Sequence, residues 1–193
     1  MPSANPIHRV AIIGFGEAGG IFAEDLAQAG VDVTVFDILF SSRRQRKRML
    51  KKAQACGVTA AASLRDCLAP ADLVISAVTA SSALEVAKDA GTILGKGQLF
   101  LDINSVSPAT KRKAAGYVAR KGARFVEAAV MSPVPQQRLR VPMLLGGPHS
   151  FETAERLQTM GMNATPLSDR LGVASAVKMC RSVVMKGLEA LVI

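Results

Sequence analysis

Aromatic residues, cysteine and histidine are scarce in this chain of 193 residues, which has no tryptophan and a single tyrosine. Proteins that bind single-stranded nucleic acid stack bases on interleaved aromatic side chains, so this shortage argues against that class despite a net charge of +9. The two histidines and three cysteines have no metal-ligand spacing, and we expect no metal site. An odd, scattered set of cysteines fits a reducing compartment better than a disulfide framework.

Long apolar runs and a secretion signal are also lacking. No run approaches the roughly 18 residues of a membrane span. The first ten residues lack the charged and apolar regions of a signal peptide. We therefore expect a cytoplasmic protein without a membrane partner. Apolar residues make up 49% of the chain, which allows a sizeable core and argues against disorder.

The positive charge is concentrated in one segment, SSRRQRKRMLKK at residues 41–52. It holds seven basic residues and no acidic one, so seven of the nine net charges lie there. The segment is either a solvated helix face or part of a ligand site. The rest of the chain is nearly neutral, and we expect no nucleic-acid partner.

Short apolar strands alternate with helical stretches over most of the chain. Apolar spacing predicts a helix from Glu17 to Ala29, and capping residues predict two more that begin at Ser107 and Ser150. Strands that are apolar on both faces predict an α/β fold, with a doubly wound, mostly parallel sheet covered by helices on both sides. The expected strands are VAIIGFG, VDVTVFD, DLVISAV, QLFLDI, ARFVEAAV and PMLLGG.

A glycine pattern follows the first strand and opens the first helix. In GFGEAG, Gly14 would make a tight turn, Gly16 would let the backbone approach a pyrophosphate, and Gly19 would let helix and strand pack closely. Free N–H groups at the helix start would meet the phosphate charge. The context predicts a dinucleotide-binding (Rossmann) domain over residues 1–167. The expected cofactor-binding residues are Gly14, Phe15, Gly16, Glu17, Ala18, Gly19, Asp37, Val78, Thr79 and Asn104.

The choice between NAD and NADP depends on residues after the second strand. Asp37 ends that strand, 18 residues beyond Gly19, and should bind the adenosine ribose hydroxyls, which favours NAD. Arg43 and Arg44 follow closely and could instead hold the 2′-phosphate of NADP. We favour NAD and keep NADP as the alternative.

Four segments, in order along the chain, resemble the β-hydroxyacid dehydrogenases, which include 6-phosphogluconate and 3-hydroxyisobutyrate dehydrogenases. They are GFGEAGG, DINSVSP at 102–108, FVEAAVMSPV at 125–134 followed by MLLGG, and GVASAVKMCRS at 172–182. The nearest branch is a phosphogluconate-dehydrogenase-like group of NAD(P)-dependent oxidoreductases. The resemblance implies hydride transfer between a nicotinamide cofactor and a small, sugar-acid-like 3-hydroxy acid, phosphorylated or not.

By this resemblance Lys178 is the acid/base residue. A lysine can take a hydroxyl proton if burial or a neighbouring cation lowers its pKa. Arg181 and Ser182 lie three and four residues later, so the three side chains share one helix face. The family usually has asparagine at one or both later positions, which leaves the substrate open. The expected substrate-binding residues are Asn104, Ser105, Ser132, Arg181 and Ser182.

The last stretch of the chain is helical without a stop signal. We expect residues 168–193 to be the first part of an interdomain helix, and the resemblance implies a helical domain after it that builds a homodimer. Two alternatives stay open: a non-catalytic dinucleotide-binding module, and an imine-reductase-like enzyme, against which Lys178 argues. For Lys178 itself the alternative is a side chain that covers apolar surface and reaches water.

Overall fold

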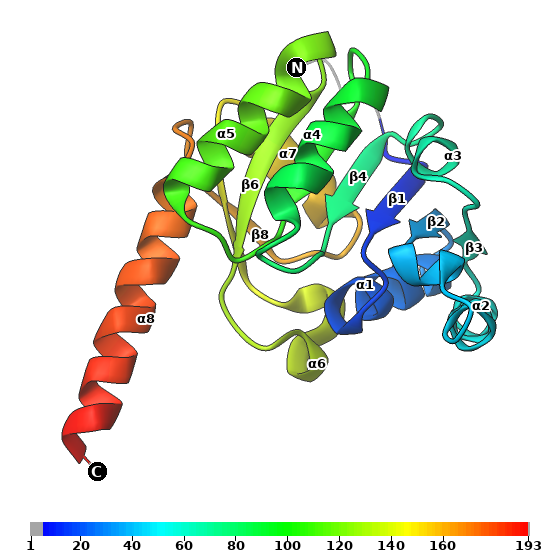
Figure 1. Ribbon diagram of the computed structural model, residues 1–193. Helices are drawn as coiled ribbons and strands as arrows, with labels where there is room; N and C mark the ends of the chain where they lie inside the picture. The colour runs from blue at the N-terminus through cyan, green and yellow to red at the C-terminus, as the bar shows by residue number, and fades with distance from the viewer. Residues whose placement is uncertain (1–5, 193) are drawn as a thin grey trace.

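The computed structural model describes residues 6–192, so the first five residues of the expected domain 1–167, and Ile193, lie outside the described residues. Strands and helices alternate along the chain (Figure 1). The strands are β1 (Arg9–Ile13), β2 (Asp32–Phe36), β3 (Thr59–Ala60), β4 (Leu73–Ser76), β5 (Leu99–Asp102), β6 (Arg124–Val130), β7 (Met143–Gly146) and β8 (Ala164–Ser168). The α-helices are α1 (Glu17–Gln28), α2 (Arg46–Ala55), α3 (Leu64–Leu68), α4 (Ala83–Ile93), α5 (Pro108–Val118), α6 (Val134–Gln137), α7 (Ser150–Thr159) and α8 (Val173–Val192), and the 3₁₀ helices are η1 (Ile38–Ser41), η2 (Ala119–Lys121) and η3 (Arg138–Arg140).

The strands form one sheet in the order β3-β2-β1-β4-β5-β6-β7-β8. Strands β1 to β6 are parallel, β7 runs antiparallel to β6, and β8 is parallel to β7. The predicted doubly wound, mostly parallel sheet is therefore confirmed. Strand order reverses between β1 and β4, and ligands of such sheets bind at the carboxyl ends of the strands beside this point.

Alternate residues of the central strands supply two apolar layers. Val10 and Ile12 of β1 belong to the layer that includes residues of α1, α2 and α7, whereas Ala11 and Ile13 belong to the layer that includes residues of α3, α4 and α5. Figure 1 shows α4 and α5 side by side over one face of the sheet. Gly91 permits this contact, because a Cβ there would collide with the carbonyl oxygen of Tyr117.

Two strands and one helix boundary differ from the sequence prediction. Strand β3 is only two residues long, and β8 contains Pro166, so neither gives the apolar run by which the other strands are recognised. The last helix begins at Val173 rather than at Ser168. Ser168 ends β8, and the turn that follows uses Gly172 with φ of 93°.

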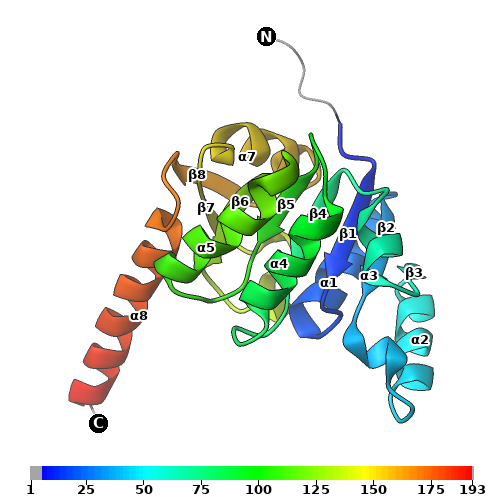
Figure 2. The same cartoon turned by 45° about the horizontal axis from the view of Figure 1, so that its top comes forward.

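Helix α8 projects from the body of the molecule in both views (Figures 1 and 2). Of its described residues only Ala174 and Ser175, in the first turn, are buried. Its apolar stripe is exposed, with Val183 at 71% and Leu188 at 54% of full exposure. Even so, neither α8 nor any other helix in residues 6–192 has the length and apolar character needed to cross a membrane.

Candidate functional site

The three glycines of the first loop have different structural reasons. Gly14 has φ of 91°, and a Cβ there would collide with the carbonyl of Ala77. A Cβ on Gly19 would collide with the carbonyl of Gly14. A Cβ on Gly16, in contrast, would meet no atom within 4 Å. The fold requires the first and third glycines but not the second, and the open space at Gly16 fits the close approach of a pyrophosphate.

Asp37 connects the end of β2 to the glycine loop. Its Oδ2 accepts the N–H of Phe15 at 2.7 Å, and its Oδ1 accepts the N–H of Leu39 at 2.9 Å. Each carboxylate oxygen can accept more than one hydrogen bond, so capacity remains for ribose hydroxyls. The carboxylate is thereby held beside the loop at which the cofactor is expected.

Lys52 also contacts this loop, which the sequence analysis did not predict. Its Nζ donates to the carbonyl oxygens of Phe15 and Gly16 at 2.9 and 2.7 Å and lies 4.4 Å from the centre of the Phe15 ring. Arg43 and Arg44 are exposed, in the turn that leads to α2. The basic segment is thus divided, because Lys52 braces the loop while the arginines face solvent.

Asn104 braces the same edge of the sheet and is only 5% exposed. Its Oδ1 accepts the N–H of Val78 at 2.7 Å, and its Nδ2 donates to Ser76 Oγ at 2.9 Å and to Asp102 Oδ1 at 2.6 Å. The amide therefore ties the carboxyl ends of β4 and β5 together. Val78 and Thr79 follow β4 directly, beside the Ala77 carbonyl that Gly14 approaches.

A buried ion pair lies beneath Asn104. Lys111 and Asp102 are each 1% exposed, with Nζ and Oδ1 3.2 Å apart, and Nζ also donates to the Asp102 carbonyl at 2.7 Å. Burial lowers the pKa of Lys111, and the charge of Asp102 opposes that effect. No sequence motif marked Lys111, which lies in the exposed-looking run KRK of α5.

Glu127 fixes the start of α8 and is fully buried in β6. Its Oε1 accepts the N–H groups of Gly172 and Ala174 at 2.7 and 3.1 Å, and its Oε2 accepts the hydroxyl of Ser175 at 2.7 Å. A carboxylate at a helix N-terminus also interacts favourably with the helix dipole. Gly146 leaves room for it, because a Cβ there would collide with Glu127 Oε1.

We expect Glu127→Gln to destabilise the protein by about 1–3 kcal/mol, because a buried charged acceptor at the helix start is lost. Chemical denaturation measures the change, and the exposed Glu155→Gln on α7 is the matched control. Equal unfolding free energies for the two variants would contradict a capping role for Glu127.

Lys178 lies in the second turn of α8, and the cap at Glu127 directs it toward the sheet edge. Its Nζ donates to Ser105 Oγ at 2.8 Å. Burial lowers the pKa of Lys178, and the positive charges of Lys111 and Arg181 lower it further. Lys178 lines a cavity of about 360 Å³. Its polar lining comes from Asn104, Ser105, Ser107, Ser175, Lys178 and Ser182.

The other two residues expected at the substrate are placed differently. Arg181 donates through Nη1 to the carbonyl of Met131, and so links α8 to the segment after β6. Ser132 follows Met131 but does not line the cavity beside Lys178, and neither does Arg181. In this geometry, three of the five residues expected at the substrate line one cavity with Lys178.

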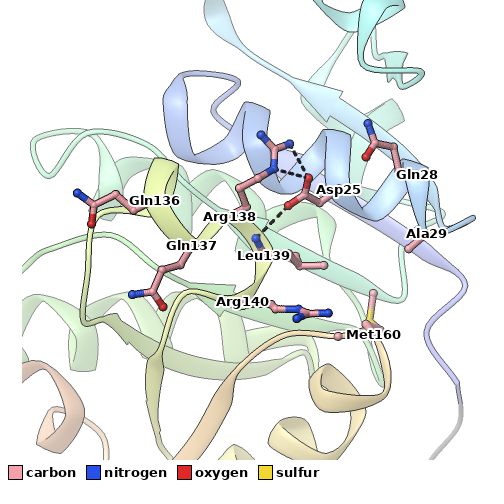
Figure 3. Close-up of a pocket in the computed structure, with 10 residues that line it drawn as sticks. Asp25, Gln28, Ala29, Gln136, Gln137, Arg138, Leu139, Arg140 and Met160 are labelled. Carbon is pink, nitrogen blue, oxygen red and sulfur yellow. Dashed lines mark hydrogen bonds and ion pairs between the residues drawn. The ribbon is translucent and has the colours of Figure 1, made fainter.

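A separate cavity of about 480 Å³ lies over α1 and η3 (Figure 3). Figure 3 shows the Arg138 guanidinium turned toward Asp25, with which it forms an ion pair, as it does with Glu24. Arg138 has φ of 52°, a conformation that is uncommon without glycine. These contacts stabilise the turn between α6 and β7. No group of three or more potential metal ligands occurs at this or any other place within residues 6–192.

Comparison with known proteins gives a match over most of the chain. Residues 9–167 match the NAD-binding domain of 6-phosphogluconate dehydrogenase. A 3-hydroxyisobutyrate dehydrogenase from Pseudomonas aeruginosa is 31% identical over 94% of this chain and 60% of its own length. A conserved protein of known structure from Sinorhizobium meliloti 1021 is 36% identical and superimposes with a TM-score of 0.91, over 97% of this chain and 63% of its own.

Solved structures of another enzyme class share the fold at lower identity. An imine reductase from Streptomyces aurantiacus is 22% identical, with a TM-score of 0.76 over 92% of this chain and 61% of its own. At this identity the similarity concerns the fold alone. The chain spans 60% of the Pseudomonas dehydrogenase and 52% of the human mitochondrial 3-hydroxyisobutyrate dehydrogenase, which is 28% identical.

Proposed function

The chain belongs to the family of the NAD-binding domain of 6-phosphogluconate dehydrogenase. We propose that it is the cofactor-binding part of an NAD(P)-dependent oxidoreductase that acts on a small 3-hydroxy acid. The observation that supports this most is the position of Lys178. Its ammonium, with a lowered pKa, hydrogen-bonds to Ser105 at the carboxyl edge of the sheet that also carries the glycine loop.

Lys178 would act as acid and base in this reaction. Oxidation of the alcohol needs a hydride acceptor, which a bound nicotinamide cofactor would supply. The neutral Lys178 Nζ would take the hydroxyl proton, and Ser105 Oγ would hold Nζ in position. Ser182, which lines the same cavity, would contact the polar groups of the acid.

The cofactor would be held by the glycine loop and Asp37. We favour NAD, because the Asp37 carboxylate would repel a 2′-phosphate, with Arg43 and Arg44 as the features that favour NADP. Asn104 would act by positioning the segments after β4 and β5, since its amide is engaged with Ser76, Val78 and Asp102.

If Arg43 and Arg44 bind a 2′-phosphate, the double change Arg43→Ala/Arg44→Ala should weaken NADPH binding about tenfold or more, because charge-assisted hydrogen bonds are lost. NADH binding should not change. Cofactor fluorescence measures both affinities. Arg46→Ala/Arg48→Ala, two exposed arginines of α2, is the matched control. Equal weakening of NADH and NADPH binding would indicate general electrostatic attraction. No change in either affinity would indicate that the two arginines only face solvent.

We also propose that α8 begins a helical domain and that the complete protein is a cytoplasmic homodimer. The apolar stripe of α8 is exposed, and its burial against a further domain or a second copy would be favourable. The length of the curated relatives, of which the chain spans part, agrees with a further domain.

A further inference from the structure

A cavity of about 650 Å³ lies at the amino edge of the sheet, opposite the glycine loop and Lys178. Residues just before or at the starts of four parallel strands line it. These are His8 before β1, Asp72 before β4, Gln98 before β5 and Arg124 at the start of β6. The candidate cofactor and substrate residues all lie at the other edge, so this cavity is a distinct place on the molecule.

A buried polar group without a partner lies at this cavity. In the part of the chain that the structure describes, only two buried side-chain polar atoms lack a hydrogen-bond partner, Thr153 Oγ1 and Arg156 Nε. Both belong to α7 and, three residues apart, share one helix face. Arg156 is 9% exposed and lines the cavity. The Arg156 Nε–H is buried without an acceptor, and leaving a buried donor of a charged group unsatisfied is costly.

Neither nearby carboxylate, Asp72 or Glu152, lies within ion-pair distance of Arg156. Asp72 Oδ2 accepts the N–H groups of His8 and Arg9, both at 2.9 Å. Glu152 pairs with Arg124 at 2.7 Å. Within residues 6–192, Arg156 forms no ion pair of its own.

The charges around the cavity leave an excess of positive charge. Three cations line it, Arg124, Arg156 and Lys96, against the two carboxylates of Asp72 and Glu152. The neighbouring His149 has a pKa lowered by burial and by the charge of Arg124, so it adds no positive charge near neutral pH. Lys96 is exposed at the rim.

We propose that this cavity binds a small oxyanion, the phosphate or carboxylate group of a soluble molecule, with Arg156 as its main ligand and Lys96 at the entrance. The oxyanion would accept from the unpartnered guanidinium and balance the excess charge. A guanidinium suits both groups, because its donors form two parallel hydrogen bonds to a pair of oxygens.

The test is calorimetric titration of the full chain with inorganic phosphate and with acetate. Ionic strength is held constant with chloride, and saturating NADH is present so that the glycine loop is filled. We expect saturable binding of at least one anion at one site per chain, and the tighter anion identifies the group. Arg156→Met should weaken binding about tenfold or more, which is the loss of a charged hydrogen-bonding partner. NADH affinity should not change.

Two further variants keep the outcome decisive. Lys96→Met changes an exposed side chain, so we expect the variant to fold. This change should also weaken anion binding. Arg48→Met on α2 removes an exposed arginine outside the cavity and should leave anion binding intact. No saturable binding of either anion would overturn the proposal. So would parent-like binding by Arg156→Met, or, if that variant does not fold, by Lys96→Met.

Discussion

Lys178→Ala lowers the turnover of a 3-hydroxy acid by about 10²–10⁴-fold, which is the usual contribution of a positioned proton acceptor. NADH affinity stays at the parent value, because the glycine loop and Asp37 are unchanged. Turnover is measured with 3-hydroxyisobutyrate as the first substrate tested, in a protein in which the proposed helical domain follows α8. Cofactor affinity is measured on this chain by NADH fluorescence.

Lys178→Arg separates proton transfer from charge. The arginine keeps the positive charge but does not release its proton at working pH, so it should fail nearly as badly as alanine. In the parent protein, burial, Lys111 and Arg181 lower the pKa of Lys178. A base must be deprotonated to act, so alcohol oxidation should rise with pH through that lowered pKa and then level off. Near-parent activity of Lys178→Arg over this pH range would contradict the acid/base role of Lys178. Only the proposed cofactor site would then stand.

Gly16→Val abolishes dinucleotide binding and leaves the protein folded. A Cβ at Gly16 meets no protein atom within 4 Å, so the side chain would occupy only the space that a pyrophosphate needs. NADH affinity should fall by at least about 100-fold, the effect of losing the close backbone approach to the phosphates. The melting temperature should stay near that of the parent.

Gly19→Val is the informative contrast. A Cβ there collides with the carbonyl of Gly14, so this variant should lose stability as well as binding. Thermal melting and NADH fluorescence, measured on both variants, distinguish the two effects. If Gly16→Val bound NADH as tightly as the parent, the cofactor site would lie elsewhere.

Those features of the site that are encoded locally were predictable from the sequence. The glycine spacing, the acidic residue after β2 and the alternation of short apolar strands depend on neighbouring residues, and they predicted the fold that the structure confirms. The resemblance of four short segments indicated the family that the comparison confirms. Strand β8 escaped prediction because it contains Pro166 and lacks an apolar run.

The contacts that position the site were not predictable in the same way. Lys52 reaches the glycine loop across 36 residues of sequence, and in a basic run it differs in no visible way from its neighbours. Lys111 likewise sits in a polar run and becomes buried only when α5 packs on the sheet. Glu127 did leave a signal, since a carboxylate in the apolar strand FVEAAV needs buried donors, but the sequence does not say that α8 supplies them.

The unequal anchoring of α8 has a consequence for amide hydrogen exchange. Only its first turn is buried and capped, so the backbone hydrogen bonds beyond it can open without disturbing the sheet. Lys178 lies just beyond the buried first turn, and Arg181 one turn further contacts the segment after β6. The contact between Lys178 and Ser105 therefore requires α8 to stay helical beyond its buried first turn. Whatever covers the outer face of this helix would slow that exchange and, by the same contact, hold the lysine at its serine.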